Sequence, residues 1–159
     1  MSNDIRPVTT KDIPALLPLI RQYWLFEDVA GFEPARVGRE LEGAVADPKL
    51  ASGWIAFARD EPVGYLLAVY VFSLEHLGLT AEIDEFFVLP SARGKGIGQA
   101  LLKRVASIAA ERGCARFEWS VLDWNQSAID FYQRLGATVM PDWRIARVTG
   151  PALMQLADR

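Results

Sequence analysis

The chain has 159 residues, of which 51% are hydrophobic and 23% are charged, and its formal net charge is −3. This composition is typical of one globular domain and excludes a disordered chain, while the small negative charge argues against a general nucleic-acid-binding protein. One cysteine, Cys114, and one histidine, His76, exclude an intramolecular disulfide and argue against a thiolate or histidine-rich metal centre.

Membrane association is not expected either. No apolar stretch approaches the length of a bilayer-spanning helix, and residues 1–5 lack the charged-then-apolar layout of a secretory signal. We therefore expect a cytoplasmic protein with no metal, no membrane partner and no nucleic-acid partner.

The first half of the chain is predicted to form a strand, two helices and then three strands. Helical spacing of apolar residues and capping residues define the helices, and aliphatic and aromatic runs define the strands. The predicted elements are a strand over 4–8, a helix capped at Thr10 or Asp12 that ends near Phe26, a helix that begins after Phe32 with Pro34 in its first turn and ends before Asp47, and strands over 54–58, 63–72 and 82–88.

The second half is predicted to alternate between helix and strand. Glycines that follow apolar periodic stretches mark two of the helix ends. The predicted elements are a helix over 97–112, a strand over 116–122, a helix over 127–135 and a strand over 143–149. This order indicates an α/β (α+β) fold in a single domain over 1–159, with helices covering a mostly antiparallel sheet.

A glycine-rich run, Arg93-Gly94-Lys95-Gly96-Ile97-Gly98, precedes the long predicted helix. The first turn of a helix has unpaired N–H groups and the positive end of the helix dipole, and glycines allow an anion to approach the backbone closely. The run therefore predicts a phosphate-binding loop, with a plain turn as the alternative. The P-loop pattern fails because no Ser or Thr follows the lysine, and the dinucleotide fingerprint fails because its third glycine is missing.

Three segments resemble the GNAT acetyltransferase superfamily. Residues 93–98 match the Arg-x-x-Gly-x-Gly motif by which that superfamily binds pyrophosphate. Residues 118–137, with their Trp-Asn, Phe-Tyr and Gly-Ala pairs, resemble the matching segment of the spermidine/spermine and thialysine N-acetyltransferases. Residues 84–88, Asp-Glu-Phe-Phe-Val, resemble the Glu-Asp-Phe-Phe-Val of the same branch. The likeness covers residues 82–137 and is weak over the first 80 residues.

The resemblance implies the GNAT fold, with a sheet of about seven strands, four flanking helices, and two central strands that splay apart after Val88 and Leu122. It also implies acetyl-CoA as co-substrate and a homodimer. The residues implied to bind acetyl-CoA are Phe86, Phe87 and Val88 through backbone pairing with the pantetheine arm, Arg93, Gly94, Lys95, Gly96, Ile97, Gly98 and Gln99 at the pyrophosphate, and Asn125 and Ala128 at the pantetheine.

Tyr132 is the predicted general acid, because acetyl transfer from a thioester expels a thiolate that a hydroxyl can protonate. The predicted base is Asp84, with Glu85 as a partial contributor, because an amine must lose a proton before it attacks. By position, Asp84 matches a water-linked glutamate of the family, and Glu85 matches the aspartate after it. Strand alternation predicts Glu82 and Asp84 on one face and Glu85 on the other.

The predicted acceptor is a primary amine of a small cationic molecule, similar to a polyamine or thialysine. Tyr23 aligns with a substrate-contacting tyrosine of the family, whereas Trp24 stands where the family has a glutamate. The residues predicted to contact the acceptor are Tyr23, Trp24, Glu27, Asp84 and Trp119, in an acidic pocket that Asp28 and Trp124 could extend.

Several alternatives stay open. Tyr132 could be an ordinary core tyrosine, and the acids of the 82–88 strand could be solvated charges at a strand end. Cys114 could be the nucleophile of an acetyl-enzyme route, although a lone cysteine without a nearby histidine is usually inert. The chain could also be a protein or peptide N-acetyltransferase, or a non-catalytic acyl-CoA-binding regulatory module.

Overall fold

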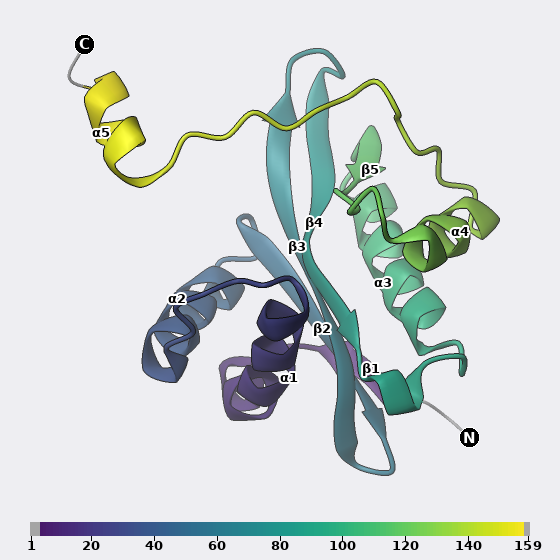
Figure 1. Cartoon of the computed structure of the whole chain (residues 1–159). Helices are drawn as coiled ribbons and strands as arrows, with labels where there is room; N and C mark the ends of the chain where they lie inside the picture. The colour runs from purple at the N-terminus through teal and green to yellow at the C-terminus, as the bar shows by residue number, and fades with distance from the viewer. Residues whose placement is uncertain (1–3, 158–159) are drawn as a thin grey trace. The chain divides into compact units, whose positions relative to one another are not determined.

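The computed structural model describes residues 4–157. The chain divides after Ser120 into two compact units, and each is described by itself. The first unit holds the sheet and three α-helices, and the second holds two α-helices (Figure 1). Within residues 4–157, no helix combines the length and the apolar character needed to cross a membrane.

The first unit begins with a strand and two helices, as predicted. Its strands are β1 (Asp4–Pro7), β2 (Ala51–Ala58), β3 (Glu61–Ser73), β4 (Gly78–Val88) and β5 (Arg116–Glu118), and its helices are α1 (Ile13–Phe26), α2 (Pro34–Ala46) and α3 (Ile97–Glu111), with 3-10 turns over Thr10–Asp12 and Pro90–Ala92. The predicted bounds of the three helices are confirmed to within one residue.

The five strands form one sheet in the order β1-β2-β3-β4-β5. Neighbouring strands from β1 to β4 are antiparallel, and β5 runs parallel to β4. A tight turn at Arg59 and Asp60, with φ of 50° and 67°, joins β2 to β3. Positive φ at both central residues matches the right-handed twist of a hairpin. The mixed, mostly antiparallel sheet with helices on it confirms the predicted fold class.

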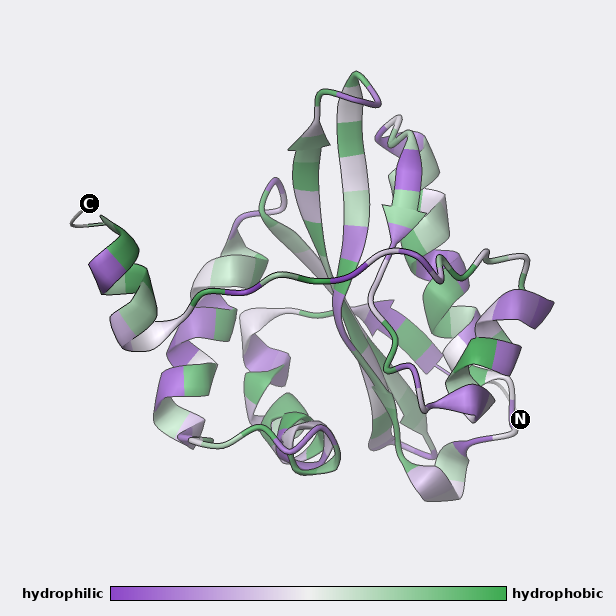
Figure 2. Cartoon of the chain, turned by 45° about the horizontal axis from the view of Figure 1, so that its top comes forward, coloured by the Kyte–Doolittle hydropathy of each residue, from purple (hydrophilic) through white to green (hydrophobic). Residues whose placement is uncertain are grey.

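Helices cover both faces of this sheet (Figure 1). On one face, Ile55 of β2, Tyr65 of β3 and Phe87 of β4 belong to a buried cluster with Leu16 of α1 and Leu41 of α2. Strand alternation turns the neighbouring residues of β2 to β4 toward α3, which contacts all three of these strands. Helices α1, α2 and α3 each carry both hydrophobic and hydrophilic stretches in Figure 2, as expected for helices that cover a sheet.

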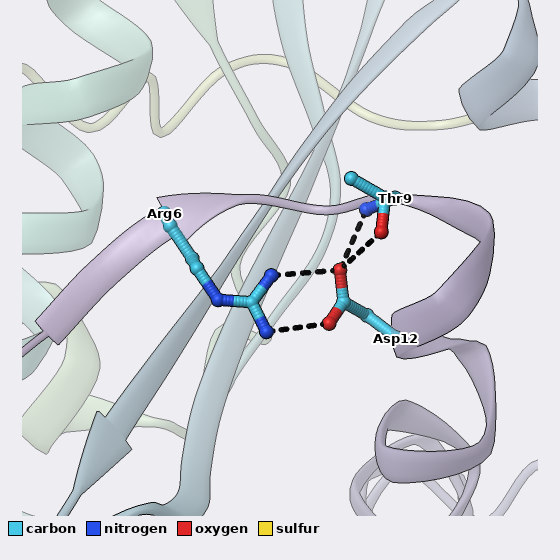
Figure 3. Close-up of polar contacts among 3 residues, drawn as sticks. All are labelled: Arg6, Thr9 and Asp12. Atoms are coloured by element: carbon cyan, nitrogen blue, oxygen red, sulfur yellow. Dashed lines mark hydrogen bonds and ion pairs between the residues drawn. The ribbon is translucent and has the colours of Figure 1, made fainter.

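A carboxylate at the start of α1 ties this helix to β1 (Figure 3). The Arg6 guanidinium donates to both oxygens of Asp12, at 2.9 and 2.6 Å, and the Thr9 N–H and hydroxyl each donate to Asp12 Oδ2 at 2.8 Å. Asp12 is buried. The Arg6 hydrogen bonds, which outweigh the effect of burial, lower the pKa of Asp12 to about 2. Asp12 directly precedes α1, as predicted, but its side chain caps no N–H of this helix and bonds to Arg6 and Thr9 instead.

The second unit contains α4 (Gln126–Arg134) and α5 (Gly150–Ala157). Asn125 caps α4, because its Oδ1 accepts a hydrogen bond from the Ala128 N–H at 3.2 Å. Gly136, with φ of 92°, follows the C-terminal end of α4. The helix predicted over 127–135 is confirmed within one residue at each end.

Three sequence-based expectations about the sheet are wrong. The strand predicted over 143–149 does not form, because strands need a partner and no strand of the described chain pairs with this segment. The strand predicted over 116–122 is only Arg116–Glu118, where its ladder with β4 ends. The described sheet therefore has five strands instead of about seven, and α5 is a fifth α-helix that was not predicted.

Candidate active site

The C-terminal half of β4 has one open edge. β5 pairs with β4 from Thr80 to Glu82, and the last paired residue of β5 is Glu118. β4 continues to Val88, so in the described chain residues 83–88 have β3 on one side and no strand on the other. This is the opening that the predicted splay requires, and it leaves backbone N–H and C=O groups available to a ligand.

A β-bulge interrupts β4 at Asp84. Leu67 of β3 pairs with Glu85 and Ala68 pairs with Ile83, so Asp84 is the extra residue. Val69 pairs with Glu82, and because Val69 and Leu67 point to the same face, Glu82 and Glu85 share that face. The predicted separation of Glu82 from Glu85 is therefore wrong, because the bulge adds one residue to the alternation.

Glu85 is held by two neutral donors. The Trp24 indole Nε1–H donates to Oε1 at 2.7 Å, and the Tyr65 hydroxyl donates to Oε2 at 2.6 Å. Burial is the main cause that raises the pKa of Glu85, and the neighbouring Asp84 and Glu27 carboxylates raise it further, against the lowering effect of the two hydrogen bonds. Burial, followed by the nearby Glu85 charge, also raises the pKa of the Tyr65 hydroxyl.

Two further carboxylates lie near Glu85. Asp84 reaches solvent at the bulge, and partial desolvation raises its pKa. Glu27 follows the last residue of α1, and partial burial raises its pKa as well. Among residues 4–157, the salt bridges give none of these three carboxylates a basic partner. The part of the chain described here holds no metal-ligating group of three or more His, Cys, Asp or Glu residues.

Aromatic side chains surround these carboxylates. Tyr23 packs on Phe87, with ring centroids 6.2 Å apart, and Trp24 packs edge-on against Phe32 at 5.4 Å. The structure therefore brings Tyr23, Trp24, Glu27, Asp84 and Glu85 to one region. Trp119 packs on Phe117 at 4.9 Å, and its contact with an acceptor stays a prediction.

The glycine-rich loop lies between Val88 and α3. Gly94 and Gly96 have φ of 74° and 79°, and an added Cβ at either position would meet no atom within 4 Å. Both glycines are needed for their backbone conformation, and both leave the backbone accessible. The first-turn N–H groups of Ile97, Gly98 and Gln99 have no acceptor within the helix, so the α3 start can bind an anion.

The two basic residues of this loop are tied to the loop backbone. Arg93 Nε donates to the Val88 carbonyl at 2.9 Å, and the guanidinium lies 5.8 Å from the Phe87 ring centroid. Lys95 Nζ donates to the Ser91 carbonyl at 3.0 Å. Arg93 therefore connects the loop to the end of β4, which fixes the loop beside the open strand edge.

The second unit carries the remaining predicted site residues. Tyr132 lies in the last turn of α4, with its ring centroid 5.4 Å from that of Phe131. The side-chain oxygen of Asn125 caps α4 through the Ala128 N–H. The roles predicted for Tyr132, Asn125 and Ala128 involve residues of the first unit, and they stay predictions.

Neither the cysteine nor the histidine belongs to this region. Cys114 follows α3, and the next residue, Ala115, donates its N–H to the Leu79 carbonyl at the start of β4. At about 3.3 Å per residue, Leu79 is roughly 20 Å along the strand from Glu85, so Cys114 is not placed as an acyl-accepting nucleophile. His76 lies in the loop between β3 and β4.

One residue of the carboxylate region was not predicted from the sequence. Tyr65 is 3% exposed and lies within the apolar β3 segment Tyr-Leu-Leu-Ala-Val, where an aromatic residue indicates core packing. The register of the β3–β4 hairpin is the signal that could have identified Tyr65. It pairs Tyr65 with Phe87 and so places Tyr65 beside Glu85. Tyr65 and Glu85 also line a cavity of about 20 Å³, which has room for about one water.

Comparison with known proteins identifies the family. A model of the acetyltransferase (GNAT) family matches residues 15–137. The chain belongs to the GNAT acetyltransferase family. The matched region contains most of α1, the open edge of β4, the glycine-rich loop and α4, so the resemblance identified from the sequence is confirmed.

Relatives and solved structures agree with this assignment. The chain is 38% identical over 100 residues to the thialysine N-epsilon-acetyltransferase of Sus scrofa, covering 61% of this chain and 58% of that protein. It is 45% identical over 74 residues to the L-ornithine N5-acetyltransferase NATA1 of Arabidopsis thaliana, covering 46% of this chain and 32% of that protein. An integron cassette protein from the mobile metagenome of V. cholerae has a similar structure, with a TM-score of 0.83, 26% identity, and coverage of 100% of this chain and 99% of that one.

Proposed function

We propose that this chain is an acetyl-CoA-dependent N-acetyltransferase that transfers an acetyl group directly to a primary amine of a small cationic acceptor. The observation that carries the proposal is the arrangement of residues 82–99. This one segment contains a strand edge without a neighbouring strand, a helix start suited to an anion, and the carboxylates of Asp84 and Glu85, which have no salt-bridge partner among residues 4–157.

The residues present fit acetyl-CoA, which supplies the thioester when it is bound. The backbone of Gly94 and Gly96 and the first turn of α3 suit a pyrophosphate. The open edge over Phe86, Phe87 and Val88 suits an amide-bearing arm that binds as an added strand does. Asn125 and Ala128 remain proposed contacts of the pantetheine.

The acceptor is proposed to bind near Asp84, Glu85 and Glu27, with Tyr23 and Trp24 beside them. Carboxylates that lack a basic partner attract an ammonium group, and aromatic faces add a cation–π contribution. Two relatives are named for thialysine and L-ornithine, amino acids whose side chains end in a primary amine. We therefore propose an acceptor of this size and charge.

In the proposed reaction, the acceptor ammonium loses one proton to Asp84, directly or through water. The amine lone pair forms a C–N bond with the thioester carbonyl carbon, and a backbone N–H of residues 86–88 stabilises the oxyanion. The C–S bond breaks, and Tyr132 protonates the leaving thiolate. The second nitrogen proton returns to Tyr132 as the amide forms, so the products are an amide, CoA thiol and one released proton.

An acceptor screen tests this proposal. We expect isothermal titration to detect acetyl-CoA binding, and we expect release of CoA thiol with at least one amine among polyamines, lysine analogues, amino acids and aminoglycosides. Binding without thiol release from any small amine or peptide would instead support a non-catalytic acyl-CoA-binding module. Absence of acetyl-CoA binding would refute the proposal. The homodimer and the cytoplasmic location remain predictions.

A further inference from the structure

We propose that Trp24 and Tyr65 are positioning residues, which hold Glu85 as a fixed anion that retains the acceptor ammonium while Asp84 takes its proton. This inference rests on the proposed function. It assigns different roles to the two neighbouring acids of β4: Glu85 binds the acceptor ammonium, and Asp84 takes its proton.

The geometry distinguishes these two acids. Both oxygens of Glu85 accept a hydrogen bond, one from α1 through Trp24 Nε1 at 2.7 Å and one from β3 through the Tyr65 hydroxyl at 2.6 Å. A carboxylate held from two elements cannot swing toward a proton donor without losing a bond to a buried group. Asp84 is the extra residue of the bulge and reaches solvent.

Asp12 provides an internal comparison for the charge of Glu85. Both carboxylates are removed from bulk solvent and accept several hydrogen bonds, but Asp12 has the Arg6 guanidinium as a partner (Figure 3) and its pKa falls to about 2. Glu85 receives only the neutral Trp24 and Tyr65 donors, and its pKa is raised. At Glu85, therefore, residues 4–157 supply hydrogen bonds but no salt-bridged cation, and a bound ammonium would supply the missing charge.

The groups that face Glu85 make its ionisation sensitive to the two donors. Glu27 from the end of α1 and Asp84 from β4 disfavour the charged form, and Tyr65 from β3 and Trp24 from α1 favour it. Tyr23 of α1 interacts with Tyr65. None of these facing groups is basic, so removing one donor leaves the other donor alone to favour the anion against burial, Asp84 and Glu27.

The variants Trp24→Phe and Tyr65→Phe test the proposal, because each keeps an aromatic ring and removes one donor. We expect the affinity for acetyl-CoA to stay unchanged and the acidic limb of acceptor kcat/KM to move to higher pH by about one to two pH units, as expected for the loss of one hydrogen bond to a charged group. Well above that limb, kcat and KM of Tyr65→Phe should return to the wild-type values. Tyr70→Phe is the matched control, because the Tyr70 hydroxyl donates to Ser52 Oγ at 3.0 Å elsewhere on β3.

A second pair of variants separates the two acids. Glu85→Gln should raise KM for a cationic acceptor at least tenfold and leave kcat within about threefold, whereas Asp84→Asn should mainly lower kcat. Trp24→Phe should not move the pH profile further in the Glu85→Gln background.

Each outcome supports or overturns the inference. A wild-type acidic limb in an active Trp24→Phe variant would overturn it, as would a Glu85→Gln variant that loses kcat and keeps KM. Trp24 is only half-buried, so we expect Trp24→Phe to fold. This variant therefore still tests the inference if Tyr65→Phe does not fold. Failure of the wild-type protein to acetylate any amine would instead refute the proposed function.

Discussion

Gly96→Ala is a direct test of the phosphate-binding loop. Gly96 precedes the first residue of α3 and has φ of 79°, and an added Cβ would meet no atom within 4 Å. Alanine therefore fits the space but not the backbone conformation, which costs an L-residue about 1–2 kcal/mol. If the loop keeps its conformation, the free energy of unfolding should fall by about this amount. If the loop relaxes instead, the affinity for acetyl-CoA should fall by about 5- to 30-fold, the same energy expressed as a binding constant.

Isothermal titration measures the change in affinity for acetyl-CoA, and denaturant unfolding measures the change in the free energy of unfolding. Gly43→Ala is the matched control, because Gly43 lies within α2 without a positive φ and without any atom within 4 Å of an added Cβ. This control should raise the free energy of unfolding by about 0.5–1 kcal/mol and leave the affinity unchanged. Wild-type affinity together with wild-type stability in Gly96→Ala would refute the reasoning.

Three further variants test the proton transfers and the helix start. Asp84→Asn should lower kcat by about 10²- to 10⁴-fold and leave acetyl-CoA binding unchanged. Steady-state kinetics should show that kcat of this variant partly recovers at high pH, where the amine is already neutral. In the wild type, whose Asp84 pKa is raised, kcat should fall as the pH drops through a value above the ordinary range of an aspartate. Tyr132→Phe should lose turnover and keep acetyl-CoA binding, and full activity would contradict its role as the acid. Asp12→Asn should lower the free energy of unfolding at pH 7 by about 2–3 kcal/mol, because the native pKa is lowered from 3.8 to about 2 and each pH unit corresponds to about 1.4 kcal/mol. The Asp12 contribution is present above pH 4 and is lost as the pH falls toward 2, so chemical denaturation should find little difference between wild type and variant near pH 2.

The helices of the first unit were predictable because local signals define them. Apolar periodicity predicted α1, a proline in the first turn predicted the start of α2, and the glycine run predicted the start of α3. The strand predicted over 143–149 shows where such signals are insufficient. Alternating apolar residues are typical of a strand, but a strand also needs a partner, and pairing is not encoded in the segment itself.

The bulge at Asp84 was not predictable from the same pattern. A run such as Glu-Ile-Asp-Glu-Phe-Phe-Val is compatible with regular alternation, and only the register against Leu67 and Ala68 of β3 reveals the extra residue. A shift of one residue in register moves a side chain to the other face of the sheet, so the bulge changes which acids share a face. The sequence therefore assigned the faces of these acids wrongly, and the catalytic roles of Asp84 and Glu85 stay predictions.

The environment of Glu85 depends on contacts between residues far apart in the sequence. Trp24 and Glu85 are separated by 61 positions and Tyr65 and Glu85 by 20, and both donors look like core aromatics when each is considered in its own segment. Trp24 also stands where the resembling family has a glutamate, so this position supplies a donor to Glu85 instead of another negative charge. One carboxylate fewer beside Asp84 and Glu27 lowers the attraction for a second ammonium. We therefore expect an acceptor screen to find higher kcat/KM for an acceptor with a single side-chain amine than for a polyamine.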